Sequence, residues 1–254
     1  MTTSIALVRA PSARLEEGIV TYIERTPVDV ELARRQHDNY RTSLSDAGWD
    51  VRFADPADDQ PDSVFIEDTV VVCDDLAVVT RPGDPERRGE LPGAEKAVRQ
   101  LGLRTAAIEA PGTLDGGDVL QVGATVYVGS GGRTNAEGIR QLRDHLAPLG
   151  RTVVPVRLRD VLHLKSAVTA LPDGTFVALP DLIEPGAFPA LRPVTEEAGC
   201  HVVALGGGEV LISASAPRTA DELAELGFGV RVVDISEFEK LEGCVSCLSV
   251  LVRL

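Results

Sequence analysis

The stretch that decides the fold reads Leu114-Asp-Gly-Gly-Asp118, then Val119-Leu-Gln-Val122, then Thr125-Val-Tyr-Val128. A polar turn precedes two short segments rich in β-branched residues, and two further residues separate these segments, which is the pattern of a β-hairpin. The same succession recurs at intervals of roughly 45 residues, and such a period indicates one supersecondary unit used repeatedly in a propeller or array. The other units begin near Asp62, His163, His201 and Gly243.

Further predicted strands lie outward from this hairpin in both directions. The strand at 247–254 is expected to pair with the strand at 3–9, so that the two ends of the chain complete a fifth unit and close a ring. The remaining predicted strand segments are 64–66, 70–73, 76–79, 167–170, 176–179, 202–205 and 210–213.

Helical patterns alternate with the hairpins. Residues 31–47 carry an apolar stripe that stops at Gly48, and residues 135–149 carry one that stops at Gly150. Weaker helices are expected at 90–101, 187–198 and 219–226. This alternation predicts an α/β architecture, and a doubly wound sheet is disfavoured because no phosphate-binding fingerprint follows the first strand. No stretch reads as an interdomain linker, so we expect a single domain over 1–254.

Composition excludes several classes of protein. The chain has 254 residues, 44% hydrophobic and 25% charged, which is ordinary for a globular domain. Its net charge of −14 would repel polyanions, so we expect no nucleic-acid partner. No apolar segment reaches the roughly 18 residues of a membrane span, and the N-terminus lacks a signal-peptide pattern. Four cysteines are too few for a disulfide framework, which favours a reducing cytoplasm.

Cys247 stands where the last apolar strand begins, a position that holds a side chain firmly while it faces a cleft. Free cysteine is also among the most buried residue types, so a packed role is the alternative. Among the four histidines, His163 precedes the strand at 167–170 and so stands at a comparable strand mouth, although it too could be a core residue. Together they form a candidate nucleophile and acid/base pair.

Polar clusters at 62–68, 114–118 and 129–135 are candidate parts of a site. Carboxylates at several strand mouths would bind a cation and orient a histidine, although such residues are also ordinary in turns. The glycine-rich run at 129–132 resembles a phosphate cradle but lacks the Gly-Lys-Ser/Thr ending of a nucleotide-binding loop. Arg133, and Arg87 with Arg88, could instead pair with a carboxylate.

Cys244 and Cys247 form a Cys-x-x-Cys pair, which can indicate zinc binding or thiol redox chemistry. No second pair and no histidine in ligand spacing accompany it, which disfavours a structural zinc site. A thioredoxin-type pair would open a helix, whereas this pair precedes β-branched residues.

Taken together, these motifs resemble the dimethylarginine dimethylaminohydrolase (dimethylargininase) family of the guanidine-modifying, or pentein, enzymes. That family has a pseudosymmetric five-unit α/β propeller fold with a central active site, which agrees with the repeats described above. The resemblance runs nearly end to end, with the motifs in the same order. The matching segments are 7–9, 28–30, 35–37, 62–68, 80–83, 87–88, 114–120, 133–135, 162–166, 247 and 249–251.

The resemblance implies roles for nine residues. The nucleophile falls on Cys247, the general acid/base on His163, and the acid that orients this histidine and the substrate guanidinium on Asp115. A loop around 14–18 is expected to act as a lid. The implied substrate-binding positions are Asp62, Glu67, the second guanidinium-binding acid Asp68, the carboxylate-binding pair Arg87 and Arg133, and the backbone carbonyl of Leu241.

The implied reaction is hydrolysis of N-methylated arginine to citrulline and dimethylamine or methylamine, through a covalent thiouronium intermediate and with no metal or organic cofactor. Two alternatives remain open at this point. An arginine deiminase would release ammonia, but that family is typically longer and has an added helical module. A catalytically silent propeller would bind methylarginine or a protein without turnover. The sequence also leaves open the preferred methylarginine and whether the chain forms a homodimer.

Overall fold

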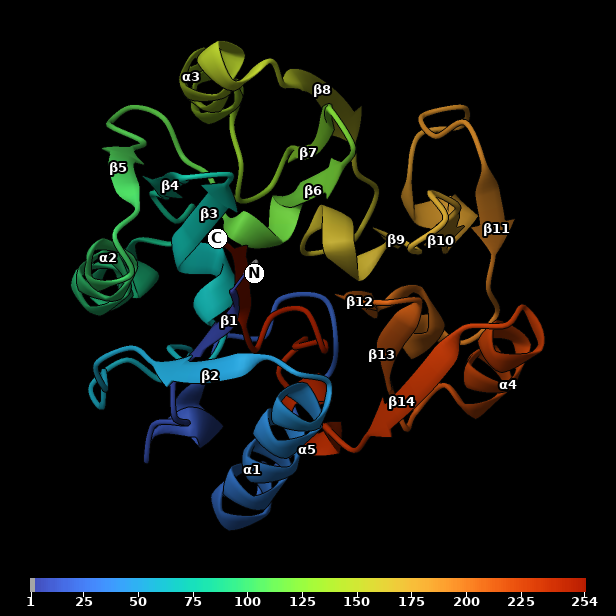
Figure 1. The fold of residues 1–254 in the computed structure, drawn as a ribbon. Coiled ribbons are helices and arrows are strands. Elements are labelled where there is room, and N and C mark those ends of the chain that lie inside the picture. The colour runs from blue at the N-terminus through green and yellow to red at the C-terminus, as the bar shows by residue number, and fades with distance from the viewer. Residues whose placement is uncertain (1–2) are drawn as a thin grey trace.

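The computed structural model describes residues 3–254, which form five three-stranded sheets arranged in a ring (Figure 1). Each sheet combines an antiparallel hairpin with a third strand that runs parallel to the middle strand. The α/β prediction and the fivefold repeat are confirmed. Within residues 3–254, no helix is both long and apolar enough to cross a membrane.

The inner strand of each sheet faces the centre of the ring (Figure 1). Polar turns precede these strands, so the loops that end at the inner strands meet around the axis. The inner strands are β3 (Val70–Cys73), β6 (Val119–Val122), β9 (Val168–Ala170), β12 (Val202–Gly206) and β15 (Val250–Arg253).

The middle strands are the most apolar part of each sheet because both of their faces are covered. Ala77 and Val78 of β4, for example, are fully buried. The middle strands are β1 (Ser4–Val8), β4 (Leu76–Val79), β7 (Thr125–Ser130), β10 (Phe176–Ala178) and β13 (Glu209–Ser213).

In four of the five sheets, an α-helix on the outside of the ring connects the middle strand to the third strand (Figure 1). Side chains cap two of them, because Asp29 accepts a hydrogen bond from the Leu32 amide and Asn135 from the Gly138 amide. The helices are α1 (Val30–Asp46), α2 (Leu91–Gln100), α3 (Ala136–Leu146) and α4 (Pro217–Glu225), and a short α5 (Ser236–Glu239) lies between the sheet that contains β12 and β13 and the last strand, β15.

The third, outer strands escaped the sequence analysis. They pair along one edge only and leave much of their surface exposed, so they carry charged residues and show no clean apolar alternation. The outer strands are β2 (Asp50–Phe53), β5 (Arg104–Ala107), β8 (Thr152–Arg157), β11 (Leu191–Pro193) and β14 (Gly229–Val233).

Two predicted elements were wrong. The helix expected at 187–198 is replaced by β11 and a 3₁₀ turn over Glu197–Cys200, because Pro189 and Pro193 cannot supply the backbone donors that a helix needs. The strand expected at 64–66 is a buried turn that leads into a 3₁₀ helix over Ile66–Thr69. The other predicted helices agree with α1 to α4 to within a few residues.

The chain ends meet as expected, because β1 pairs with β15 in antiparallel register, Ile5 opposite Val252 (Figure 1). β15 begins at Val250, however, so Cys247 lies in a turn just before the strand rather than within it. All four cysteines are free.

Candidate active site

The loops around the axis of the ring enclose a small cavity. Its volume of about 20 Å³ has room for roughly one water molecule. Seven of the nine site residues predicted from the sequence line it, together with Ile19, Phe65, Leu162, Glu242 and Gly243. The seven are Asp62, Asp68, Arg87, Arg133, His163, Leu241 and Cys247. The other two, Asp115 and Glu67, lie directly behind this lining.

Cys247 is held by the backbone on both sides. Its amide donates to the Cys244 carbonyl at 3.0 Å, and its carbonyl accepts from the Glu67 amide at 3.2 Å. The Cys244 amide lies 3.4 Å from the Cys247 sulfur, to which it donates. The thiol is therefore fixed at the cavity wall with a backbone N–H directed at the sulfur.

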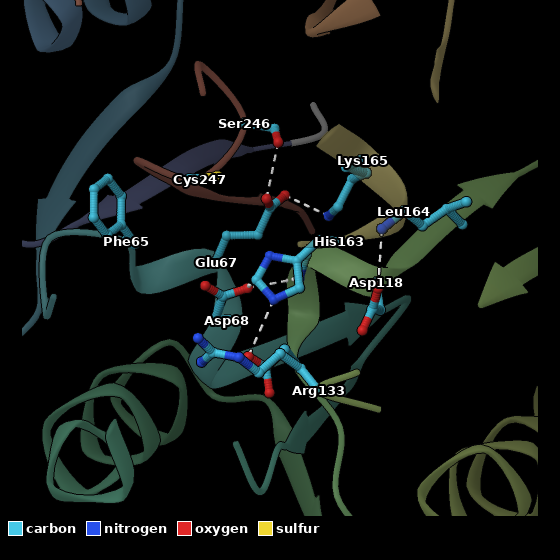
Figure 2. Close-up of polar contacts among 12 residues, drawn as sticks. Phe65, Glu67, Asp68, Asp118, Arg133, His163, Leu164, Lys165, Ser246 and Cys247 are labelled. Atoms are coloured by element: carbon cyan, nitrogen blue, oxygen red, sulfur yellow. Dashed lines mark hydrogen bonds and ion pairs between the residues drawn. The ribbon is translucent and has the colours of Figure 1, made fainter. Parts of the chain in front are cut away.

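His163 lies between two carboxylates (Figure 2). Its Nε2 is 3.1 Å from Oδ2 of Asp115, and its Nδ1 is 3.8 Å from Oδ1 of Asp68. Burial alone would lower the pKa of His163, but Asp68, Asp115 and Asp118 together raise it to about 9. The imidazole is therefore protonated at neutral pH and can donate a proton.

Gly116 and Gly117 allow this close packing. A Cβ on Gly117 would lie 2.6 Å from Nδ1 of His163, and one on Gly116 would lie 1.9 Å from the Glu67 carbonyl oxygen. The Gly117 amide also donates to Oδ1 of Asp68 at 2.8 Å. The Asp-Gly-Gly-Asp segment is thus more than a tight turn, because its backbone packs directly against both Asp68 and His163.

Asp118 is a supporting residue to which the sequence analysis gave no role. Its carboxylate accepts from the Leu164 amide at 2.9 Å (Figure 2) and from the Thr134 hydroxyl at 2.6 Å. Burial raises the pKa of Asp118 to about 7, an effect that nearby His163 opposes. Asp118 therefore fixes the backbone next to His163, and only its place in the Asp-Gly-Gly-Asp motif could have drawn attention to it.

Arg87 is fully engaged by the protein. Its guanidinium contacts Oδ2 of Asp68 at 2.5 Å, both carboxylate oxygens of Glu90 and two backbone carbonyls. Burial would raise the pKa of Asp68, but His163 and Arg87 lower it to about 2. Glu90, which follows Arg87 by three residues, was missed by the sequence analysis although it forms the second half of this buried pair.

Glu67 faces away from the cavity. Its carboxylate contacts Lys165 at 2.5 Å and the Ser246 hydroxyl at 2.9 Å (Figure 2), and it lines a second cavity of about 180 Å³ instead. Burial raises the pKa of Glu67 to about 7, an effect that Lys165 opposes. Glu67 thus contacts Ser246, the neighbour of Cys247, and does not line the cavity.

The thiol of Cys247 is in a setting that disfavours the thiolate. Its hydrogen bond with Cys244, its burial and the carboxylates of Glu67 and Asp68 raise the pKa of Cys247 well above the ordinary value. A cation placed in the cavity would reverse part of this effect, because positive charge stabilises the thiolate.

A segment near the N-terminus covers the cavity. The Ile19 amide donates to the carboxylate of Asp62 at 3.1 Å, and the amides of Thr21 and Tyr22 donate to Glu242 at 2.5 and 2.9 Å. Ile19 lines the cavity, whereas the lid predicted at 14–18 is a 3₁₀ turn just before it. Because the cavity is too small for an amino acid, we expect this segment, the covering segment at 19–22, to move when one binds.

Arg133 has more binding capacity left than Arg87. It lies 3.8 Å from Asp84 and 3.4 Å from the Thr21 hydroxyl, both long contacts. A guanidinium so loosely held at a cavity wall can bind a carboxylate with its two parallel N–H groups.

One set of side chains among residues 3–254 has the geometry of a metal site. Ligand atoms of Asp68, Asp115 and His163 lie within 4.8 Å of one another. The same carboxylates already accept hydrogen bonds from Arg87, Gly117 and Gly83, and they fix the imidazole between them. The donor set is thus already used to hold a charged histidine.

Replacing Asp115 with asparagine should lower the pKa of His163 from about 9 toward its ordinary value near 6.5. A raised pKa stabilises the fold fully below pH 6.5, and this contribution is lost as pH rises through about 9, so the variant should lose stability mainly at neutral pH and below. NMR titration of the imidazole resonances measures the shift. A midpoint that stays near 9 would show that Asp115 does not hold the charge.

The assembled groups suit one kind of chemistry. A thiol, an imidazolium and a pair of carboxylates converge on one buried space, with an arginine at its rim. Such a site can bind a cation, add sulfur to it and protonate a leaving group.

Comparison with known proteins points to one family. No family model matches the chain. The N(G),N(G)-dimethylarginine dimethylaminohydrolase of Streptomyces coelicolor is 56% identical over 254 residues, which cover 100% of this chain and 98% of that protein.

Two solved structures agree with this likeness. The Pseudomonas aeruginosa dimethylarginine dimethylaminohydrolase, as a mutant complexed with citrulline, superposes with a TM-score of 0.91 at 34% identity over 99% of this chain and 100% of that one. A dimethylarginine dimethylaminohydrolase adduct with S-methyl-L-thiocitrulline gives a TM-score of 0.90 at 33% identity, with the same coverage.

Proposed function

The chain belongs to the dimethylarginine dimethylaminohydrolase family, and from this membership we propose that it hydrolyses N-methylated arginines to citrulline and dimethylamine or methylamine. The observation that carries the proposal is the convergence of Cys247, His163 and Asp68 on one cavity, with Asp115 behind the histidine. One of the related structures is a complex with citrulline, and the other is an adduct with S-methyl-L-thiocitrulline.

Binding of the substrate cation prepares the reaction. A guanidinium carbon is a poor electrophile because its charge is delocalised, so we assign Asp68 and Asp115 to localise that charge and fix the plane of the group. The cation in turn lowers the pKa of Cys247, which the empty site raises, so that the substrate helps to ionise its own nucleophile.

The covalent steps use the charged histidine. The thiolate of Cys247 adds to the guanidinium carbon, and His163 donates its proton to the departing methylated amine. The histidine, now neutral, accepts a proton from the water that attacks the thiouronium intermediate. The carbon–sulfur bond then breaks, Cys247 leaves as the thiolate and citrulline is released, while the proton that the histidine has taken from the water restores the imidazolium.

The substrate's amino-acid end is assigned to the rim. Arg133 is placed to bind its carboxylate, and Asp62 and the Leu241 carbonyl its amino group. Arg87 is a second proposed carboxylate ligand, although it would have to release Asp68 or Glu90 to take this part. Glu67 is likewise a proposed substrate-binding position, and in the present conformation it reaches the site through Ser246.

Replacing Arg133 with alanine should raise KM by roughly ten- to a hundredfold, the value of one charge-assisted contact, and change kcat little. The carboxylate clamp acts equally in the ground state and the transition state, so its loss weakens binding. Steady-state kinetics with asymmetric dimethylarginine measures both constants, and Arg133→Lys, which keeps the charge without the fork, should fall between. A loss confined to kcat would contradict this role.

A panel assay tests the proposed function. We expect citrulline from asymmetric dimethylarginine and monomethylarginine, with release of the matching amine, and little from arginine. Preference for arginine with release of ammonia would indicate a deiminase. Binding without turnover, and without a covalent adduct on Cys247, would indicate a silent propeller.

We also propose that residues 1–254 act as one catalytic domain, because all five sheets contribute to a single ring around one site. The free state of all four cysteines supports a reducing compartment such as the cytoplasm. The sequence leaves open whether the chain forms a homodimer through an edge of the ring.

A further inference from the structure

A second thiol lies against the nucleophile. The sulfurs of Cys244 and Cys247 are 3.2 Å apart, and the Cys244 side chain is almost fully buried behind the cavity wall. None of the steps proposed above uses Cys244. The other two cysteines are placed differently, since the Cys200 thiol donates to the carbonyls of Ser166 and Glu197 and Cys73 belongs to the core cluster of another sheet.

The backbone already has the shape that a bridge between these sulfurs requires. The Cys247 amide donates to the Cys244 carbonyl at 3.0 Å, so residues 244–247 form a hydrogen-bonded turn. The Cα atoms at the ends of such a turn lie less than about 7 Å apart, within reach of the roughly 4.4–6.8 Å span of disulfides. No large movement of the chain is needed to join the two sulfurs.

Only one of the pair faces the cavity. Cys247 lines it and Cys244 does not, so a small oxidant that reaches the site meets Cys247 first. The hydrogen bond with Cys247 and the nearby His201 lower the pKa of Cys244, whereas the hydrogen bond with Cys244 raises the pKa of Cys247. Cys244 is therefore the sulfur that ionises first, and transfer of the Cys247 proton across the 3.2 Å contact to Cys244 leaves Cys247 as the thiolate. This is the arrangement of an attacking thiol and a resolving thiol.

We propose that Cys244 and Cys247 form a reversible disulfide when the enzyme meets a peroxide, and that this bond switches off the nucleophile while protecting it from irreversible oxidation. The inactivation part of the proposal rests on the proposed role of Cys247, whereas formation of the bond does not. Transient redox-sensing disulfides are the kind that occur in reducing compartments.

The chemistry balances with hydrogen peroxide as oxidant. The Cys247 thiolate attacks one peroxide oxygen, an S–O bond forms, the O–O bond breaks and hydroxide leaves. The Cys244 sulfur then attacks the sulfenic sulfur, an S–S bond forms, and the S–O bond breaks as the oxygen leaves with the Cys244 proton as water. Two sulfurs lose two electrons, and the peroxide gains them. A dithiol reverses the reaction by two thiol–disulfide exchanges.

Peptide mass analysis tests the bond directly. Trypsin cleaves after Lys240 and after Arg253 and should therefore release residues 241–253 as one peptide. This peptide contains Cys244 and Cys247 and neither of the other two cysteines. The full-length reduced protein is treated with a small excess of hydrogen peroxide, alkylated and digested. We expect the peptide to lose about 2 Da and to resist alkylation, and dithiothreitol to restore both its thiols.

Activity measured on the same samples tests the switch. Citrulline formation should fall in step with disulfide formation, to less than about a tenth, and should return with dithiothreitol because the nucleophile is intact. In Cys244→Ala, and in Cys244→Ser should the first variant fold poorly, the same peroxide treatment should leave a loss that dithiothreitol does not repair, because sulfenic Cys247 proceeds to sulfinic acid. Each variant is compared with its own reduced activity. Cys73→Ala is the matched control and should behave like the unaltered protein.

Two results would overturn the proposal. One is a peptide 241–253 that gains the mass of oxygen and keeps at least one thiol that can be alkylated. The other is a Cys244 variant that recovers as completely as the unaltered protein. Failure of the reduced protein to make citrulline would count against the proposed function instead, and the peptide mass would still decide whether the disulfide forms.

Discussion

Replacing Cys247 with serine is expected to reduce citrulline formation by about 10⁴-fold or more, which is typical for loss of a nucleophile. A serine hydroxyl needs a neutral base to remove its proton, but His163 is protonated at neutral pH because three carboxylates raise its pKa to about 9. The substrate's positive charge can ionise a thiol but is far too weak to ionise an alcohol.

The fold should tolerate this change. Backbone bonds to Cys244 and Glu67 hold the turn that contains Cys247, and the slightly smaller serine can still accept the hydrogen bond that the Cys244 amide donates to the sulfur. Steady-state assays with asymmetric dimethylarginine, together with thermal unfolding, separate lost chemistry from lost structure. A serine variant that keeps substantial turnover at an unchanged Tm would remove the thiol from the mechanism.

Replacing His163 with glycine should reduce turnover by roughly 10²- to 10⁴-fold, the usual contribution of a general acid and base. The departing amine would leave without a proton, and the intermediate would lack a base for its hydrolysis. Removing the ring also leaves a space lined by Asp68 and Asp115. Added imidazole should therefore bind there and restore part of the activity.

The rescue distinguishes chemistry from packing. His145→Ala serves as the matched control, because His145 lies on α3, hydrogen-bonds to the Ala107 carbonyl and does not line the cavity, so activity should be unchanged. Amine release in a single turnover is the direct readout. If His163→Gly released amine at the normal rate without added imidazole, another group would have to be the acid.

Much of this fold could be predicted from the sequence, because the inner hairpins repeat and their β-branched residues are buried. The outer strands could not, since strands such as β2 and β5 are stabilised by pairing with a neighbour and by a covering helix rather than by an apolar pattern of their own. The helix predicted at 187–198 is absent for a related reason. The effect of Pro189 and Pro193 on the backbone outweighs the helix propensity of the surrounding residues.

The candidate site divides in the same way. Residues whose chemistry is distinctive, such as Cys247 and His163, could be predicted, and the structure brings them to one cavity. Asp118, Glu90 and Glu242 could not, because their roles are to hold other groups and depend on contacts between segments far apart in the chain. The environment of Arg87 also appears only in three dimensions, where Glu90 and Asp68 occupy its guanidinium.

Opening of the covering segment at 19–22 is expected to limit the turnover rate. With a space of about 20 Å³ beneath it, every substrate molecule that arrives and every product molecule that leaves must wait until the bonds to Asp62 and Glu242 break. Such loop motions take microseconds to milliseconds in enzymes and often limit turnover. A faster nucleophile would then bring no gain in throughput, whereas weakening the contacts of Glu242 would speed both arrival and departure at the expense of shielding the intermediate from bulk solvent.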